Sequence, residues 1–213
     1  GEVRLVFIAN PNNPTGTYVS QSELAEFMSQ FGGRDDLLVV LDEAYWEFVR
    51  AEDYPHSMDF LRDYENVAVL RTVSKVFGLA GARLGALMAR PHILDYINRV
   101  RNPFNVNSLA QVGALAALQD QDYLKRVQEI NWQGLDQIQD GLKQLGLRFL
   151  PSQANFVFFD CGHDAQEFFN QLLQKGVILR PVPAPGYETW LRFSVGLSEE
   201  NQTALTAIES VLN

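Results

Sequence analysis

The sequence has one cysteine, Cys161, among 213 residues. A lone cysteine excludes an internal disulfide framework and suits a reducing cytosol, so we expect a cytoplasmic protein. Histidine is also scarce: His56, His92 and His163 are widely separated. They lack the partner spacing of a metal site or a catalytic triad, and we therefore expect no bound metal.

Basic residues are also few. Lys and Arg total 17 against 26 Asp and Glu, which gives a formal net charge of -9, and the chain contains no basic run. Nucleic acid and anionic membrane surfaces are therefore not expected partners. The sequence also lacks a signal-peptide pattern and an uninterrupted apolar stretch long enough to span a bilayer.

Apolar residues, by contrast, are plentiful. They make up 46% of the chain, ample for a packed core. The sequence begins Gly1-Glu2, without Met, and enters a buried-strand pattern at once. Because a central parallel strand needs neighbours on both sides, we expect this chain to be a piece of a longer protein.

The first half alternates apolar runs with helical patterns, which is typical of an α/β domain with a mainly parallel sheet. Ser20 and Glu23 have the spacing of a capping box, so a helix is predicted over 20–31. Pro91 is suited to the first turn of another helix. Strands are predicted over 4–9, 37–41, 67–72 and 84–89.

The second half predicts long helices followed by a small α/β lobe. We expect a partial large domain over 1–118, then an interdomain helix and small C-terminal domain over 119–213. The predicted helices cover 107–120, 121–146, 164–175 and 198–212, and the predicted strands cover 155–160, 177–180 and 190–195.

Polar side chains follow three strands of the first lobe: Asn10 to Asn13, Asp42, and Ser74-Lys75. Ligands of open α/β sheets bind beyond the carboxyl ends of the strands. A lysine there commonly forms a Schiff base, and lysine with aspartate is the pair expected for pyridoxal 5'-phosphate. Two alternatives remain open, namely that Asp42 only caps a helix and that Lys75 only pairs with Asp42.

Several ordered motifs resemble the fold-type-I pyridoxal-phosphate-dependent aminotransferases, most closely their histidinol-phosphate branch. They are NPNNPTG (10–16), LDEAYWEF (41–48), RTVSKVFGLAGARLG (71–85) and VRNPFNVN (100–107), continued by PSQANFVFF (151–159) and LRFSVG (191–196). The resemblance covers almost the whole chain. It implies a partial large cofactor domain joined to a small C-terminal α/β domain.

The resemblance also implies roles for individual residues. Lys75 would form the Schiff base with the cofactor and afterwards carry the proton at the substrate Cα. Asp42 would pair with the pyridine nitrogen, while Asn13 and Tyr45 would bind the phenolic oxygen.

Anion ligands are implied in the same way. Ser74 and Arg83 would bind the cofactor phosphate, since a hydroxyl and a guanidinium suit an anion. Arg192 would bind the acidic group of the substrate, and Arg180 is a second candidate for that group.

The implied reaction moves an amino group between L-histidinol phosphate and 2-oxoglutarate, with glutamate as the partner product, in a homodimer. The family's N-terminal segment supplies a Gly-rich phosphate turn, a stacking aromatic residue and a tyrosine donated across the dimer. We expect this chain, which lacks that segment, to be inactive alone. Alternatives are an aromatic amino-acid aminotransferase, a threonine-phosphate decarboxylase-like enzyme, and the sensor domain of a transcription regulator.

Overall fold

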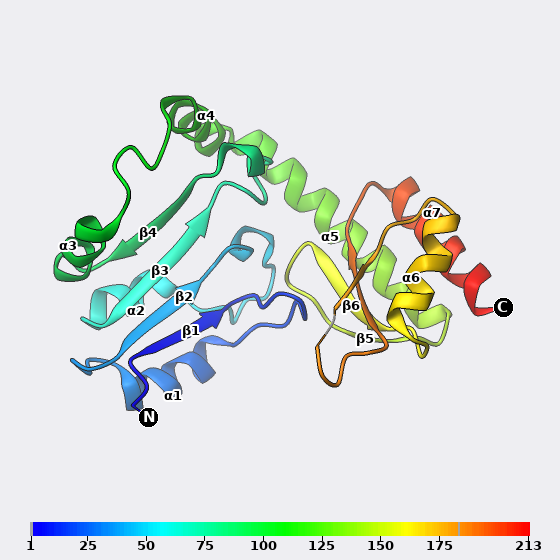
Figure 1. Cartoon of the computed structure of the whole chain (residues 1–213), viewed down its shortest axis with the longest axis horizontal. Helices are drawn as coiled ribbons and strands as arrows, with labels where there is room; N and C mark the ends of the chain where they lie inside the picture. The colour runs from blue at the N-terminus through cyan, green and yellow to red at the C-terminus, as the bar shows by residue number, and fades with distance from the viewer. Residues whose placement is uncertain (1, 183) are drawn as a thin grey trace. The chain divides into compact units, whose positions relative to one another are not determined.

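The computed structural model describes residues 2–182 and 184–213. The chain divides into two compact units (Figure 1). Unit 1 comprises Gly1–Pro11 and Tyr18–Lys125, and unit 2 comprises Asn12–Thr17 and Arg126–Asn213. The chain passes between the units three times, and the last passage, after Lys125, lies inside one helix, α5 (Gln121–Gln144).

Unit 1 is built on a four-stranded sheet in the order β1-β2-β3-β4. Strands β1, β2 and β3 are parallel, and β4 is antiparallel to β3. The α/β class with a mainly parallel sheet is therefore confirmed. The strands are β1 (Leu5–Ala9), β2 (Leu38–Asp42), β3 (Val67–Thr72) and β4 (Gly85–Ala89).

Two helices of unit 1 pack on one face of this sheet. Leu24 and Met28 of α1 and Phe60 of α2 join the core formed with β2 and β3. Helix α1 begins with the expected capping box, in which Ser20 and Glu23 satisfy each other's backbone N–H groups. The helices are α1 (Gln21–Phe31), α2 (Ser57–Asp63), α3 (Pro91–Val100) and α4 (Ser108–Gln119), with short 3-10 turns η1 (Trp46–Phe48) and η2 (Ala80–Ala82).

Apolar side chains of unit 1 are exposed on β1 and α4. Phe7 is 63% exposed on β1, and Leu109, Val112 and Leu115 are exposed on α4. Exposed apolar side chains of this kind mark surfaces suited to further packing.

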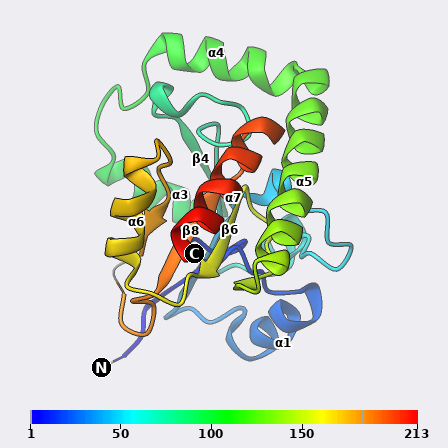
Figure 2. The same ribbon diagram turned by 90° about the vertical axis from the view of Figure 1, so that its right-hand side faces the viewer.

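Unit 2 is a four-stranded antiparallel sheet in the order β5-β6-β8-β7. Three helices, α5, α6 and α7, cover one face of it (Figure 2), and their apolar side chains share one core with the strands. The remaining elements are β5 (Arg148–Leu150), β6 (Phe156–Asp160), α6 (Ala165–Gln174), β7 (Arg180–Pro181), β8 (Trp190–Ser194) and α7 (Ser198–Leu212).

The strand predicted over 177–180 is wrong in extent, because β7 begins only at Arg180. Val177 and Leu179 are buried, which explains two of the three apolar residues in this run. The backbone N–H of Val177, however, donates to Leu172 at the end of α6 instead of to β8. Helix α2 and strand β5 were not predicted at all, because both are short and lack a long periodic pattern.

Candidate active site

Asp42 is the last residue of β2 and closes the turn that follows it. Its Oδ1 accepts a hydrogen bond of 3.1 Å from the backbone N–H of Ala44. The next helical turn, η1, begins at Trp46, has Tyr45 as its N-cap residue and has no side-chain cap. The alternative in which Asp42 caps a helix is therefore wrong.

Lys75 lies just beyond the carboxyl end of β3, the strand adjacent to β2. Its Nζ is 5.0 Å from the centroid of the Tyr45 ring, a cation–π contact. Tyr45 is 7% exposed, whereas Lys75 is exposed. Within residues 2–182 and 184–213 no ion pair joins Lys75 to Asp42, so the ion-pair alternative is not what the structure shows. The amine remains available for chemistry beside a phenol.

Ser74 and Arg83 lie on two adjoining segments that continue β3 and β4. The backbone N–H of Val73 and the hydroxyl of Thr72 both donate to the carbonyl of Leu84, at 3.3 and 3.1 Å. These bonds extend the antiparallel pairing one step past the sheet, toward Ser74 and Arg83. Unit 1 therefore contains five predicted site residues along one edge: Asp42, Tyr45, Ser74, Lys75 and Arg83.

Arg83 has a left-handed backbone, with φ 53. This conformation is costly for a residue with a Cβ and is found mostly where the surrounding structure requires it. The guanidinium donates from Nη1 to the carbonyl of Ala80 at 2.8 Å, which orients the side chain over its own loop.

The other three predicted residues, Asn13, Arg180 and Arg192, belong to unit 2. Nη1 of Arg192 donates to Oδ1 of Asn13 at 2.8 Å. The turn that carries Asn13 is attached to unit 2 through Gly16, whose carbonyl accepts from the backbone N–H of Gln153 at 2.8 Å.

Arg180 and Arg192 are direct register partners on β7 and β8. Side chains directly opposite each other on antiparallel strands share a face, and like charges in that position repel. In the part of the chain that the structure describes, Nε of Arg192 is buried and has no hydrogen-bond partner. An anion at this face would relieve the repulsion and satisfy the buried donor.

Two charged residues of unit 1 that the sequence did not single out are bonded to each other. Oε2 of Glu43 accepts a hydrogen bond of 2.9 Å from Nε of Arg71 and lies 2.8 Å from Nη2 in an ion pair. The guanidinium lies 3.9 Å from the centroid of the Trp46 ring. The available signal was an arginine inside the apolar strand VAVLRT, because such a charge requires a buried partner.

Glu47, also buried, lies close to this pair. Burial raises the pKa of its carboxyl to about 7, and the nearby positive charge of Arg71 only partly offsets the effect. Glu47 borders a mainly apolar cavity of about 270 Å³, which Trp46, Phe77 and Leu118 also line.

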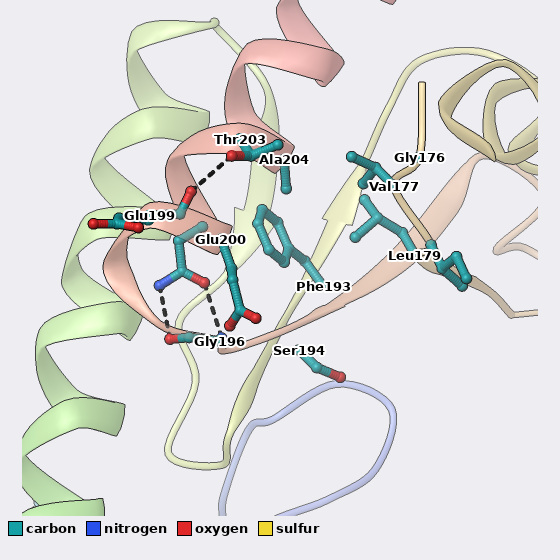
Figure 3. Close-up of a pocket in the computed structure, with 12 residues that line it drawn as sticks. Gly176, Val177, Leu179, Phe193, Ser194, Gly196, Glu199, Glu200, Thr203 and Ala204 are labelled. Carbon is teal, nitrogen blue, oxygen red and sulfur yellow. Dashed lines mark hydrogen bonds between the residues drawn. The ribbon is translucent and has the colours of Figure 1, made fainter. Parts of the chain in front are cut away.

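A larger cavity of about 560 Å³ lies in unit 2, between residues 176–179 and the start of α7 (Figure 3). Its polar groups are used internally: Asn201 both donates to and accepts from the backbone of Gly196, and Glu200 accepts from the N–H of Leu197. The predicted site residues do not line this cavity, so it is not the candidate active site.

Among the described residues no cluster of three or more His, Cys, Asp or Glu side chains has the geometry of a metal site. The helices of the same residues include none that combines the length and the apolar character needed to cross a membrane.

The family model described as aminotransferase class I and II matches residues 1–208. Histidinol-phosphate aminotransferase of Bdellovibrio bacteriovorus is 50% identical over 210 residues, which are 99% of this chain and 56% of that protein. The Moorella thermoacetica enzyme of the same name is 48% identical, over 98% of this chain and 54% of that protein.

A crystal structure of histidinol-phosphate aminotransferase from Sinorhizobium meliloti, in complex with pyridoxal-5'-phosphate, superposes with a TM-score of 0.87 at 32% identity. The match covers 98% of this chain and 57% of that one. The chain thus spans little more than half the length of these relatives.

Proposed function

Because this chain belongs to the class I and II aminotransferase family, we propose that its protein transfers an amino group between L-histidinol phosphate and 2-oxoglutarate, with pyridoxal 5'-phosphate as cofactor. The observation that carries the proposal is the meeting of Lys75 and Tyr45 at the strand edge where Asp42 ends β2. The 50% identity to a histidinol-phosphate aminotransferase supports the choice of substrate.

The polar and charged groups at the sheet edge of unit 1 match the functional groups of the proposed cofactor. Pyridoxal phosphate offers an aldehyde, a pyridine nitrogen, a phenolic oxygen and a phosphate, and the edge offers an amine, a carboxylate, a phenol, a hydroxyl and a guanidinium. Lys75, exposed and not ion-paired to Asp42, is free to attach the aldehyde. When bound, the cofactor supplies an electron sink that stabilises negative charge at the substrate Cα.

Each residue then has a defined task. Asp42 would hold positive charge on the pyridine nitrogen, because a carboxylate favours the protonated form of a neighbouring base. Tyr45 would donate toward the phenolic oxygen. Lys75 would hold the cofactor through its amine, and that amine would also carry the proton at the substrate Cα. Ser74 and Arg83 would bind the phosphate.

The residues of unit 2 would bind the substrate and orient the cofactor. Arg192 and Arg180 together match a phosphate dianion or a carboxylate, for which paired guanidinium donors are well suited. Asn13, whose Oδ1 accepts from Arg192, would donate from its amide N–H₂ group toward the phenolic oxygen.

We further propose that the active enzyme is a cytoplasmic homodimer with more chain than these 213 residues. Exposed apolar side chains on β1 and α4, Phe7 and Leu109 among them, provide a surface that additional chain or a second subunit would bury. The isolated chain is then expected to show no measurable transamination, since part of the cofactor pocket would be missing.

Borohydride reduction in the presence of pyridoxal phosphate, followed by peptide mass spectrometry, tests the cofactor assignment. In the full-length enzyme we expect one adduct, on the peptide that contains Lys75. An adduct on another lysine, or scattered labelling, would remove Lys75 from the mechanism. The same reaction on the 213-residue chain shows whether unit 1 retains the site without further residues.

Steady-state kinetics test the substrate. We expect kcat/KM for L-histidinol phosphate to exceed that for phenylalanine by about 100-fold or more, since the phosphate adds charge-assisted hydrogen bonds. Faster turnover of phenylalanine would favour an aromatic aminotransferase, and release of CO₂ from threonine phosphate would indicate a decarboxylase.

A further inference from the structure

One residue, Glu43, holds the Asp42-to-Tyr45 turn to β3, the strand that precedes Lys75. Glu43, at the start of the turn, is 1% exposed, and its backbone N–H donates to the carbonyl of Leu70 on β3 at 2.9 Å. Its carboxylate is bonded to Arg71, the next residue of β3. Lys75 follows four residues later on the same segment.

Arg71 contacts Glu43 within the turn and Trp46 directly after it. Its Nε donates to Oε2 of Glu43 and its Nη2 forms an ion pair with the same oxygen, while its guanidinium lies over the ring of Trp46, which directly follows Tyr45. The second oxygen of Glu43 accepts a hydrogen bond from the hydroxyl of Ser57. Both oxygens of the carboxylate are therefore engaged, and the side chain has one orientation.

A buried ion pair of this kind is poor evidence of added stability, because desolvation offsets most of the attraction. The contribution of the pair is to orientation. The guanidinium of Arg71 bonds the Glu43 carboxylate through its nitrogens and carries the Trp46 indole over its face. Both contacts restrict the position of the turn at the end of β3. Tyr45 lies in that turn, with its ring 5.0 Å from Nζ of Lys75.

We propose that Glu43 and Arg71 are positioning residues that set the placement of Tyr45 against the Lys75 amine. This inference rests on the proposed function for its effect on turnover. Neither residue contacts the reacting atoms, so the pair acts through Tyr45 and Lys75. Ser57 orients the carboxylate of Glu43, and Trp46 orients the guanidinium of Arg71.

The test compares the full-length enzyme with the double variant Glu43→Leu/Arg71→Met. The double variant removes both charges of the pair and is expected to fold, whereas Glu43→Gln alone leaves the half-buried guanidinium of Arg71 without its carboxylate. Asp36→Asn is the matched control, because it breaks an exposed two-bond pair with Arg34 at the opposite end of β2. Far-UV circular dichroism confirms folding of each variant.

In the double variant we expect kcat to fall by about 100-fold, the order of loss that a 1 Å misplacement produces. KM for the amino donor should stay within about threefold, because Arg192 and Arg180 are untouched. The visible circular dichroism of bound pyridoxal phosphate should weaken or change sign. Arg71→Lys should restore only part of kcat, since an ammonium keeps the charge but not the planar fork.

A second readout does not depend on turnover. In cofactor-free protein, the rate at which an acylating reagent labels the Lys75 amine should change by about threefold or more in the double variant, since the Tyr45 ring beside the amine moves. Asp36→Asn should leave that rate unchanged. Unchanged kcat, dichroism and labelling rate in a folded double variant would overturn the positioning role and leave the proposed function intact.

Failure of the proposed function can be told apart from failure of the positioning role. If the unaltered full-length enzyme neither transaminates nor forms a Lys75 adduct, the proposed function fails. The labelling rate of Lys75 in the double variant then still decides the placement of Tyr45 by Glu43 and Arg71, and an unchanged rate overturns it.

Discussion

Nη1 of Arg192 donates a hydrogen bond of 2.8 Å to Oδ1 of Asn13, although 179 positions separate the two residues in the sequence. Arg192 also has Arg180 as its register partner on the neighbouring strand. The amide thus holds one guanidinium of a repelling pair in a fixed orientation. A preoriented guanidinium loses less conformational entropy when it binds an anion.

Replacement of Arg192 by lysine should weaken binding of the acidic substrate. Loss of charge-assisted hydrogen bonds worth about 2–3 kcal/mol corresponds to a rise in KM of roughly 30- to 100-fold. Steady-state kinetics of the full-length enzyme measure this. Arg148→Lys is the control, because Arg148 pairs with Asp160 at an exposed position of the same sheet. Equal effects of the two replacements would exclude a specific role for Arg192.

Two substitutions at Arg83 separate its effect on stability from its effect on cofactor binding. Its left-handed backbone costs a residue with a Cβ about 1–2 kcal/mol, so Arg83→Gly should be more stable than Arg83→Ala by about 1 kcal/mol. Both variants should release pyridoxal phosphate more readily, since both lose the guanidinium. Thermal unfolding and cofactor titration check the two parts. Tight cofactor retention by either variant would remove Arg83 from the phosphate site.

Glu47 should make the stability of unit 1 depend on pH. Its folded-state pKa of about 7 exceeds the ordinary value of 4.5, so its contribution is fully present below pH 4.5 and is lost as the pH rises through 7. The difference of about 2.5 pKa units corresponds to roughly 3 kcal/mol of unfolding free energy. Above pH 7 the contribution should no longer change.

Urea unfolding of Glu47→Gln and of the unaltered chain between pH 4.5 and 7.5 measures this effect. The variant should gain stability relative to the unaltered chain as the pH rises, because it has no proton to release. Glu52→Gln, at an exposed position of the same unit, serves as the control and should not gain. Parallel curves for all three proteins would contradict the raised pKa of Glu47.

Gly16 should tolerate no side chain. Its φ is +73, and an added Cβ would lie 2.2 Å from Oγ of the buried Ser152. Gly16→Ala should therefore cost about 3 kcal/mol, from backbone strain and from overpacking together. Gly33→Ala isolates the backbone part, because Gly33 has φ +74 with open space around its Cβ position. If the two variants have the same melting temperature, the contact with Ser152 does not anchor the Asn13 turn.

Local signals in the sequence predicted much of this fold. The capping box of Ser20 and Glu23 placed α1, and the apolar run of residues 67–72 gave the bounds of β3 as the structure has them. These features depend on residues near one another in the chain, where hydrogen-bond partners and side-chain period can be read directly. The α/β class follows from them.

Other features depended on distant partners. The extent of β7 is limited because Val177 bonds to the end of α6, and the antiparallel direction of β4 is a property of the sheet as a whole. The sequence likewise did not predict that Asn12–Thr17 belongs with unit 2.

The sequence by itself determined the chemical groups of the candidate site: an amine at Lys75, a carboxylate at Asp42, a phenol at Tyr45 and guanidiniums at Arg83 and Arg192. Ordered motifs identify such groups because their spacing is local. Only the tertiary structure decided which groups meet. It paired Glu43 with Arg71 and Asn13 with Arg192, because a buried or oriented charge takes its partner from whichever strand packing brings within hydrogen-bond distance.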